Sequence, residues 1–185
     1  MGYLIDRMRR PQLVRRLMPI RILTSLGLAA LSTSPAQALC IYNGVDNVET
    51  TIEQEFRDSP WVVRAHVVSV DYHWSDKDES WAFYRLKVVE RFKGDLSERF
   101  TFFTMRNSGG FYMDADGGGP DLDGDYLLFL TPRPWPRYDP PIAKGALWVN
   151  YNCGQSKAWS KVTQDEHAQL RELSATSSTK RKIIR

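Results

Sequence analysis

Residues 82–92 have the sequence Ala82-Phe-Tyr-Arg-Leu-Lys-Val-Val-Glu-Arg-Phe92, in which apolar and charged side chains alternate. Successive side chains of a β-strand point to opposite faces of a sheet. One set of positions is apolar and is expected to face a core: Tyr84, Leu86, Val88 and Phe92. The other set carries most of the charge: Phe83, Arg85, Lys87, Val89 and Arg91. The segment therefore predicts a half-buried strand.

Four further segments have the composition of short strands, rich in β-branched and aromatic residues and bounded by turn-forming residues. They are residues 61–70, 100–105, 126–130 and 146–150. The polar residues 74–80 are expected to form a hairpin tip, and residues 93–96 a turn. Five short strands separated by turns favour a small β-barrel or sandwich over βαβ units.

Two helices are expected to flank the strands. Residues 45–57 place apolar side chains at helical spacing and end at Asp58-Ser-Pro60. Thr163 and Glu166 have the spacing of a capping box, which predicts a helix that runs through Leu173. The polar and basic residues 174–185 are expected to form a flexible tail.

The charges are distributed unevenly along the 185 residues. Of the 25 basic and 22 acidic side chains, ten bases and one acid lie in residues 1–38 and 180–185. The body between them keeps 15 bases and 21 acids, a net charge of −6. Nucleic-acid binding depends on the neutralisation of phosphates by basic side chains. The composition therefore predicts a folded globular protein that does not bind nucleic acid.

Residues 1–38 have the three parts of a secretory signal peptide. An Arg-rich start is followed by the uncharged residues 22–31 and by Ala36-Gln37-Ala38, a site with the small residues that signal peptidase accepts. An apolar run this short is too short to span about 30 Å of hydrocarbon. We therefore expect cleavage after Ala38, a periplasmic or secreted protein, and no stable membrane span after cleavage.

The mature chain would contain two cysteines, Cys40 and Cys153. Exported proteins meet oxidising conditions, in which an even number of cysteines predicts a disulfide. The chain has no Cys-x-x-Cys motif and no His close in sequence to either cysteine, which argues against a metal-binding or reactive pair. On the chain-entropy model, a bridge that closes so long a loop would contribute about 4–5 kcal/mol.

Residues 114–125 combine glycines with five aspartates: Asp114, Asp116, Asp121, Asp123 and Asp125. Carboxylate oxygens are the ligands that Ca²⁺ prefers, and part of the spacing matches an EF-hand loop. A solvated acidic turn is the favoured interpretation, because Gly and Asp also favour turn conformations. We therefore expect no cofactor, with Ca²⁺ bound by these aspartates as the alternative, and a Ca²⁺-dependent structural or adhesion domain is an alternative function.

Known catalytic motifs are missing from the sequence. None of the three histidines belongs to a nucleophile elbow or a zinc-protease motif. We therefore expect no enzymatic activity, with a hydrolase of unrecognised site as an alternative. Trp74 and Trp135 fall in loops, where an exposed aromatic side chain can anchor a partner protein and local packing is the other possibility. Local packing is the favoured interpretation of the two residues, and they are the candidate contacts if the protein binds a partner, whose identity is unknown.

The order of these features resembles the netrin-like module, the OB-fold domain shared by the tissue inhibitors of metalloproteinases and small exported bacterial proteins. The resemblance rests on the strand at 61–70 and on Tyr84-Arg-Leu-Lys-Val-Val-Glu-Arg-Phe-Lys-Gly94, Gly124-Asp-Tyr-Leu-Leu-Phe-Leu130 and Asn152-Cys153-Gly154. It implies a mainly β domain over residues 39–173, a five-stranded OB-fold-like closed barrel with flanking N- and C-terminal helices that binds proteins and is inhibitor-like. In the metalloproteinase inhibitors the N-terminal Cys contacts the catalytic zinc, whereas Leu39 would precede Cys40 here.

Overall fold

The computed structural model describes residues 41–42, 45–46, 49–77, 79–106, 110–133, 137, 139–151 and 153–183. The predicted signal peptide, Cys40 and Trp135 lie outside these residues. Within the described part of the chain, no helix is both long enough and apolar enough to cross a membrane.

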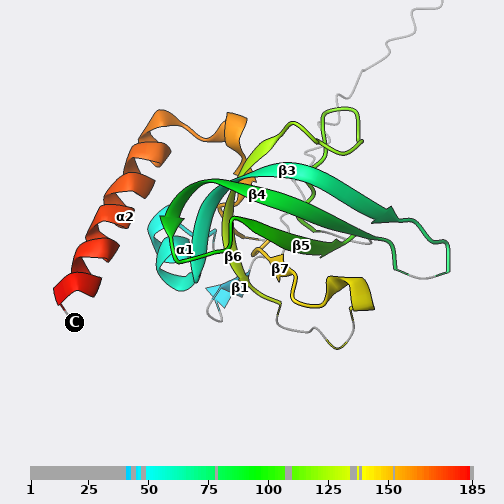
Figure 1. The fold of residues 1–185 in the computed structure, drawn as a ribbon, viewed down its shortest axis with the longest axis horizontal. Helices are drawn as coiled ribbons and strands as arrows, with labels where there is room; N and C mark the ends of the chain where they lie inside the picture. Colours follow the sequence, from blue (N-terminus) through cyan, green and yellow to red (C-terminus); the bar gives the residue numbers. More distant parts are fainter. Residues whose placement is uncertain are drawn as a thin grey trace, which may run out of the picture. The chain divides into compact units, whose positions relative to one another are not determined.

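Five strands form a closed barrel, as predicted (Figure 1). They are β3 (Trp61–His73), β4 (Trp81–Lys93), β5 (Arg99–Met105), β6 (Asp125–Pro132) and β7 (Leu147–Trp148). Neighbouring strands pair in the order β3-β4-β5-β7-β6, and β6 pairs back onto β3 to close the ring. The β5–β7 pairing is parallel and the others are antiparallel. The short strand β8 (Lys157–Ala158), which the sequence analysis missed, adds to β6.

The set of β4 positions that was predicted to face the core does so. Within this set, Tyr84, Leu86 and Val88 are buried in the barrel interior, with Val63, Leu128 and other residues of the same core. Phe83 is also buried, on the opposite face, where the segment containing η2 (Pro141–Ala143) covers it. The charged set of positions is therefore open to solvent over only part of its length.

The unbroken apolar run of β6 has a simple cause, because this strand is buried on both faces. Leu128 and Leu130 pack in the barrel interior. Leu127 and Phe129 belong to a second cluster, which lies between the barrel and the helices. The remaining members of that cluster are Ile52, Phe56, Val62, Phe92 and Leu170.

Helix α1 (Ile52–Asp58) begins later than predicted. Val45 belongs to β2 (Val45–Asp46), which pairs with β1 (Ile41–Tyr42). The helix begins where Thr51 and Gln54 form a capping box, each side chain accepting a backbone N–H from the other residue. The sequence analysis had missed this start signal.

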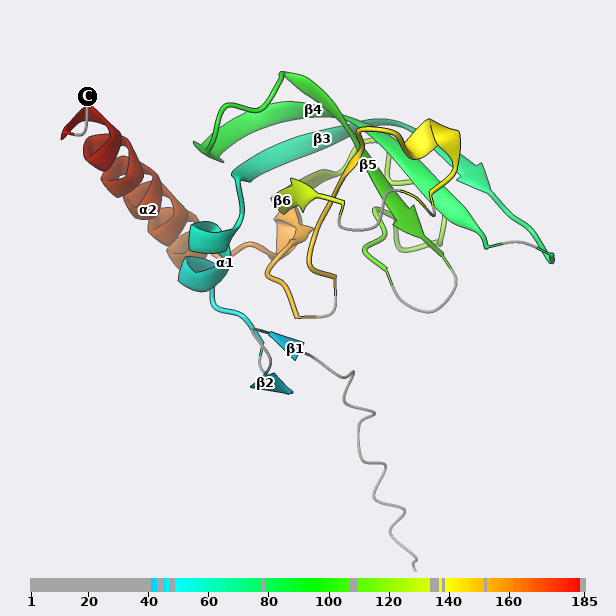
Figure 2. The same cartoon turned by 90° about the horizontal axis from the view of Figure 1, so that it is seen from below.

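Helix α2 (Gln164–Ile183) follows the short helical turn η3 (Trp159–Lys161) and packs beside α1 at one end of the barrel (Figure 2). Thr163 and Glu166 form the predicted capping box, with hydrogen bonds of 3.2 and 2.9 Å. The helix does not end at Leu173, as predicted, but continues to Ile183. Residues 174–183 contain no Gly or Pro that would interrupt helical hydrogen bonding.

Candidate functional site

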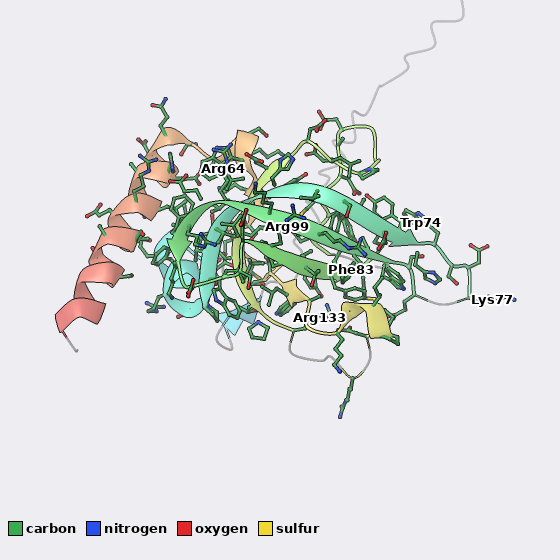
Figure 3. The ribbon with its side chains drawn as sticks, in the orientation of Figure 1. Arg64, Trp74, Lys77, Phe83, Arg99 and Arg133 are labelled. Carbon is green, nitrogen blue, oxygen red and sulfur yellow. The ribbon has the colours of Figure 1, made fainter. Side chains whose placement is uncertain are left out.

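The hairpin of β3 and β4 carries one of the two tryptophans assigned to partner binding. The strands pair as far as His73 and Trp81, whose rings stack with centroids 5.1 Å apart. Trp74 follows immediately, and Figure 3 shows Trp74 and Lys77 at this end of the hairpin. Two long paired strands therefore support the position of Trp74.

The guanidinium group of Arg106 lies among three aromatic rings beside this tip. Its carbon Cζ is 4.9 Å from the ring centres of Tyr72 and Trp74 and 4.5 Å from that of Tyr112. The Asp114 carboxylate accepts hydrogen bonds from both terminal nitrogens, at 2.6 and 3.2 Å. The side chains of this ion pair are only 10% and 16% exposed. We call these five residues the arginine cage, in which ring electrons and a carboxylate together hold one cation.

Tyrosine hydroxyls complete the contacts of Asp114. Tyr72 donates to its Oδ1 at 2.7 Å and Tyr84 at 3.3 Å, while Tyr84 also accepts the backbone N–H of Met113. Burial and then the hydrogen bond to Asp114 raise the pKa of Tyr72 to about 12, and burial raises the pKa of Tyr84 further. Burial raises the pKa of Asp114, but hydrogen bonds from Arg106 and Tyr72 outweigh it and hold this pKa below its usual range. The low pKa of Asp114 and the raised pKa of Arg106 favour the charged forms of both groups, so their ion pair holds the side chains of the cage in place.

Trp74 remains 64% exposed although one side of its ring is supported. Its ring centroid is 5.9 Å from that of Tyr72, and Arg106 covers it from within the cage. A large aromatic side chain that is both exposed and held in place loses little conformational freedom when a partner covers it. Trp135, the second tryptophan assigned to partner binding, lies outside the described residues.

The five aspartates proposed for calcium take different partners. Asp114 binds Arg106, Asp121 accepts a 2.9 Å hydrogen bond from the Tyr126 hydroxyl, and Asp125 pairs with Arg64 and His66. Asp116 and Asp123 are exposed. Among the residues that the structure describes, no three His, Cys, Asp or Glu side chains are grouped to hold a metal ion. Calcium binding by this loop stays a prediction from the sequence.

His66 and Asp125 form the arrangement closest to catalytic chemistry, with Nδ1 and Oδ1 2.9 Å apart. The two residues face each other across β3 and β6. A hydrolase of the serine or cysteine type also needs a nucleophile on the other ring nitrogen. No Ser, Thr or Cys side chain in the described part of the chain is hydrogen-bonded to His66.

Cys153 is buried, and the chain that follows Cys40 is bound close to it. The carbonyl oxygen of Cys153 accepts the backbone N–H of Thr50 at 3.0 Å and the Thr50 hydroxyl at 2.7 Å. Cys40 lies outside the described residues, so the disulfide stays a prediction. The contacts of Thr50 thus join the first part of the domain to the segment around Cys153, ahead of α2.

Glu55 lies beside the contacts between Thr50 and Cys153, and the sequence analysis did not identify it as a candidate residue. Only 4% of the residue is exposed, and one carboxylate oxygen accepts from the Gln155 backbone N–H and the Thr50 hydroxyl. The other oxygen, Oε1, has no hydrogen-bond partner among the described residues. Burial raises the pKa of Glu55 to about 7. Its side chain also lines a pocket of about 160 Å³, which Asp58 and Trp148 share.

Arg106, Tyr72 and Tyr112 are the other residues of the site that sequence reasoning missed. They come from β3 and from two stretches after β5, so no local spacing connects them. The acidic stretch at 114–125 pointed to Asp114, but as a metal ligand rather than as the partner of an arginine. The sequence matches no protein-family model, and a search of curated proteins returns no relative.

Proposed function

We propose that the protein is an exported, non-enzymatic protein-binding module of the netrin-like OB-fold type. In this proposal residues 1–38 direct export to the periplasm or beyond, Cys40 and Cys153 form a disulfide, and the partner is a protein rather than a nucleic acid. The acidic body, with its net charge of −6, supports the choice of partner.

One observation carries the proposal. Trp74 is 64% exposed at a hairpin tip, and its ring is held by Tyr72 and Arg106. Tryptophan and arginine are enriched among the residues that dominate the energy of protein interfaces. If Trp74 served only local packing, burial of its other ring face against the domain would stabilise the fold further, because buried apolar surface lowers the free energy.

The test is a photo-crosslinking amino acid at position 77, introduced into cells that produce the protein. Lys77 is exposed and close in sequence to Trp74. We expect one crosslinked product of defined mass, which disappears when Trp74→Ala is added. Thermal unfolding of Trp74→Ala is the control for folding. We expect a melting temperature close to that of the unchanged protein, because most of the Trp74 side chain is exposed.

The matched control places the same photo-reactive residue at position 172. Glu172 is exposed on α2, away from the hairpin in sequence. A product of the same mass from both positions, or one that survives Trp74→Ala, would contradict a binding site at the hairpin tip.

A further inference from the structure

The outer face of β4 and β5 carries a group of basic side chains. Arg85 pairs with Thr101 and Lys87 pairs with Arg99 across the two strands. Directly opposed residues of a sheet share a face, and Leu86 between them is buried in the barrel core. Arg85, Lys87 and Arg99 therefore lie together on the outside of the barrel, and we call them the basic face.

The positive charge of the basic face is only partly compensated. Arg85 binds Asp71 at 2.9 Å, and Lys87 is 3.6 Å from Glu98. The side chains of these pairs are about half exposed, so solvent screens the attraction between the charges. Each pair therefore contributes little to the stability of the fold. Arg99 is exposed and makes no ion pair with any described residue. A cluster of this kind is notable on a domain body whose net charge is −6.

A pocket of about 190 Å³ opens between the two arginines. It is lined by Val68, Arg85, Leu86, Arg99, Phe100 and Thr101. Val68 stands at a shift in the pairing of β3 with β4 and is 46% exposed, so its side chain is accessible at the pocket. Three of the lining residues are apolar and two are cationic, so the pocket offers an apolar seat with positive charge at its margin.

We infer that the basic face binds an acidic segment of a partner protein, with one apolar side chain in this pocket and a neighbouring carboxylate on Arg99. The inference rests on the proposed protein-binding function and adds the chemistry of the partner. Pockets for drug-sized molecules usually measure about 300–1,000 Å³, so this one suits a single side chain. An arginine without an ion pair is also the group best able to accept a new carboxylate.

An acidic peptide must be compared with single-stranded nucleic acid, a second kind of anionic chain, which OB-fold barrels bind on this face. Such binding uses exposed aromatic rings on which the bases stack. On this face Phe83 and Phe103 are buried in a cluster with Ala143 and Ala146, and Trp81 is partly buried against that cluster. Among the described residues, β4 and β5 thus offer stacking bases only two partly buried rings, Trp81 and Phe100, beside a cluster of positive charge and an apolar pocket, which favours an acidic peptide.

The experiment titrates the purified protein with the blocked tripeptide Glu-Leu-Glu and follows backbone amide shifts by NMR. We expect saturable shifts at Val68, Arg85 and Thr101, with a Kd of about 0.1–1 mM. Arg99→Ala should raise this Kd about fivefold, as expected for the loss of one partly exposed charged contact. Arg57→Ala is the matched control, because it removes the same charge from an exposed arginine outside the pocket and should leave the Kd unchanged.

Two further probes separate the parts of the inference. Glu-Ser-Glu keeps both charges without the apolar side chain and should bind more weakly, and an oligothymidine should not bind. Equal binding of Glu-Ser-Glu, an equal effect of Arg57→Ala, tighter binding of the oligothymidine, or no saturation by about 10 mM peptide would each overturn the inference. If crosslinking from position 77 succeeds while the peptide fails, protein binding stands and the acidic segment is wrong. If the peptide binds while crosslinking fails, the hairpin proposal alone is lost.

Discussion

Asp114 and Glu55 are both carboxyl groups held within the fold, yet their surroundings move their pKa values in opposite directions. Asp114 accepts hydrogen bonds from a guanidinium and two tyrosine hydroxyls. Glu55 accepts from one backbone N–H and one hydroxyl, and no ion pair reaches it within the described residues. Burial penalises both charges, and the presence of a cation at hydrogen-bond distance decides which one persists. The charged form of Asp114 is therefore favoured by its ion pair with Arg106, whereas burial raises the pKa of Glu55 to about 7.

The strongest way to break this comparison is to remove the cation. Arg106→Met should leave Asp114 as an uncompensated carboxylate and should lower the free energy of unfolding by about 3 kcal/mol. Urea unfolding at pH 7 measures this loss. Arg171→Ala is the control, because that arginine is mostly exposed and its loss should cost no more than about 0.5 kcal/mol. Similar losses in the two variants would mean that the cage does not hold Asp114 charged.

A smaller effect of the opposite sign is expected at Glu55. Its pKa is about 7 in the folded protein and near 4.5 when exposed, so the folded state binds the proton more tightly. The stability that this provides is complete below pH 4.5 and is lost as pH rises through 7. Glu55→Gln should therefore raise the free energy of unfolding by about 2 kcal/mol at pH 8 and change it little at pH 4. Urea unfolding across this pH range would contradict the assignment if the difference between the variants did not depend on pH.

The smallest of the three effects is expected for Tyr72→Phe, and it separates the contribution of the Tyr72 hydroxyl to Asp114 from that of Arg106. Tyr72→Phe removes one hydroxyl donor to Asp114 while Arg106 stays in place, so the loss should be about 1 kcal/mol. Thermal unfolding measures it, with Tyr151→Phe as a control at a tyrosine that is 44% exposed. A loss as large as that of Arg106→Met would assign the main support of Asp114 to the tyrosine.

Local patterns predicted much of the fold. The alternation at 82–92 and the capping box of Thr163 and Glu166 depend on neighbours in the sequence, and both have the expected structure. The late start of α1 escaped because Val45 has an apolar side chain at helical spacing but pairs in a short strand instead. The burial of Phe83 also escaped, since the segment that covers it comes from residues 141–146.

The candidate site was less accessible to sequence reasoning. Trp74 was identified because it falls in a predicted loop, where an exposed aromatic side chain can anchor a partner. Its support by Arg106 depends on the position of the chain after β5, which no spacing in the sequence encodes. The same holds for Glu55, whose burial under Gly154 and Gln155 joins residues about a hundred positions apart. Charge and hydropathy identified candidate residues, and only the tertiary structure paired them.

The closure of the barrel has a kinetic consequence. Between β5 and β7 the described residues contribute one register pair, Phe102 with Leu147, whereas β3 and β4 are paired along almost their whole length. A junction with so few hydrogen bonds opens locally at a lower free energy than the whole domain unfolds. We expect amide hydrogens of residues 147–148 to exchange with solvent faster than those of the β3–β4 hairpin. Local opening of the β5–β7 pairing would then expose the chain to proteases. The lifetime of the protein in their presence would depend on this pairing rather than on the size of the core.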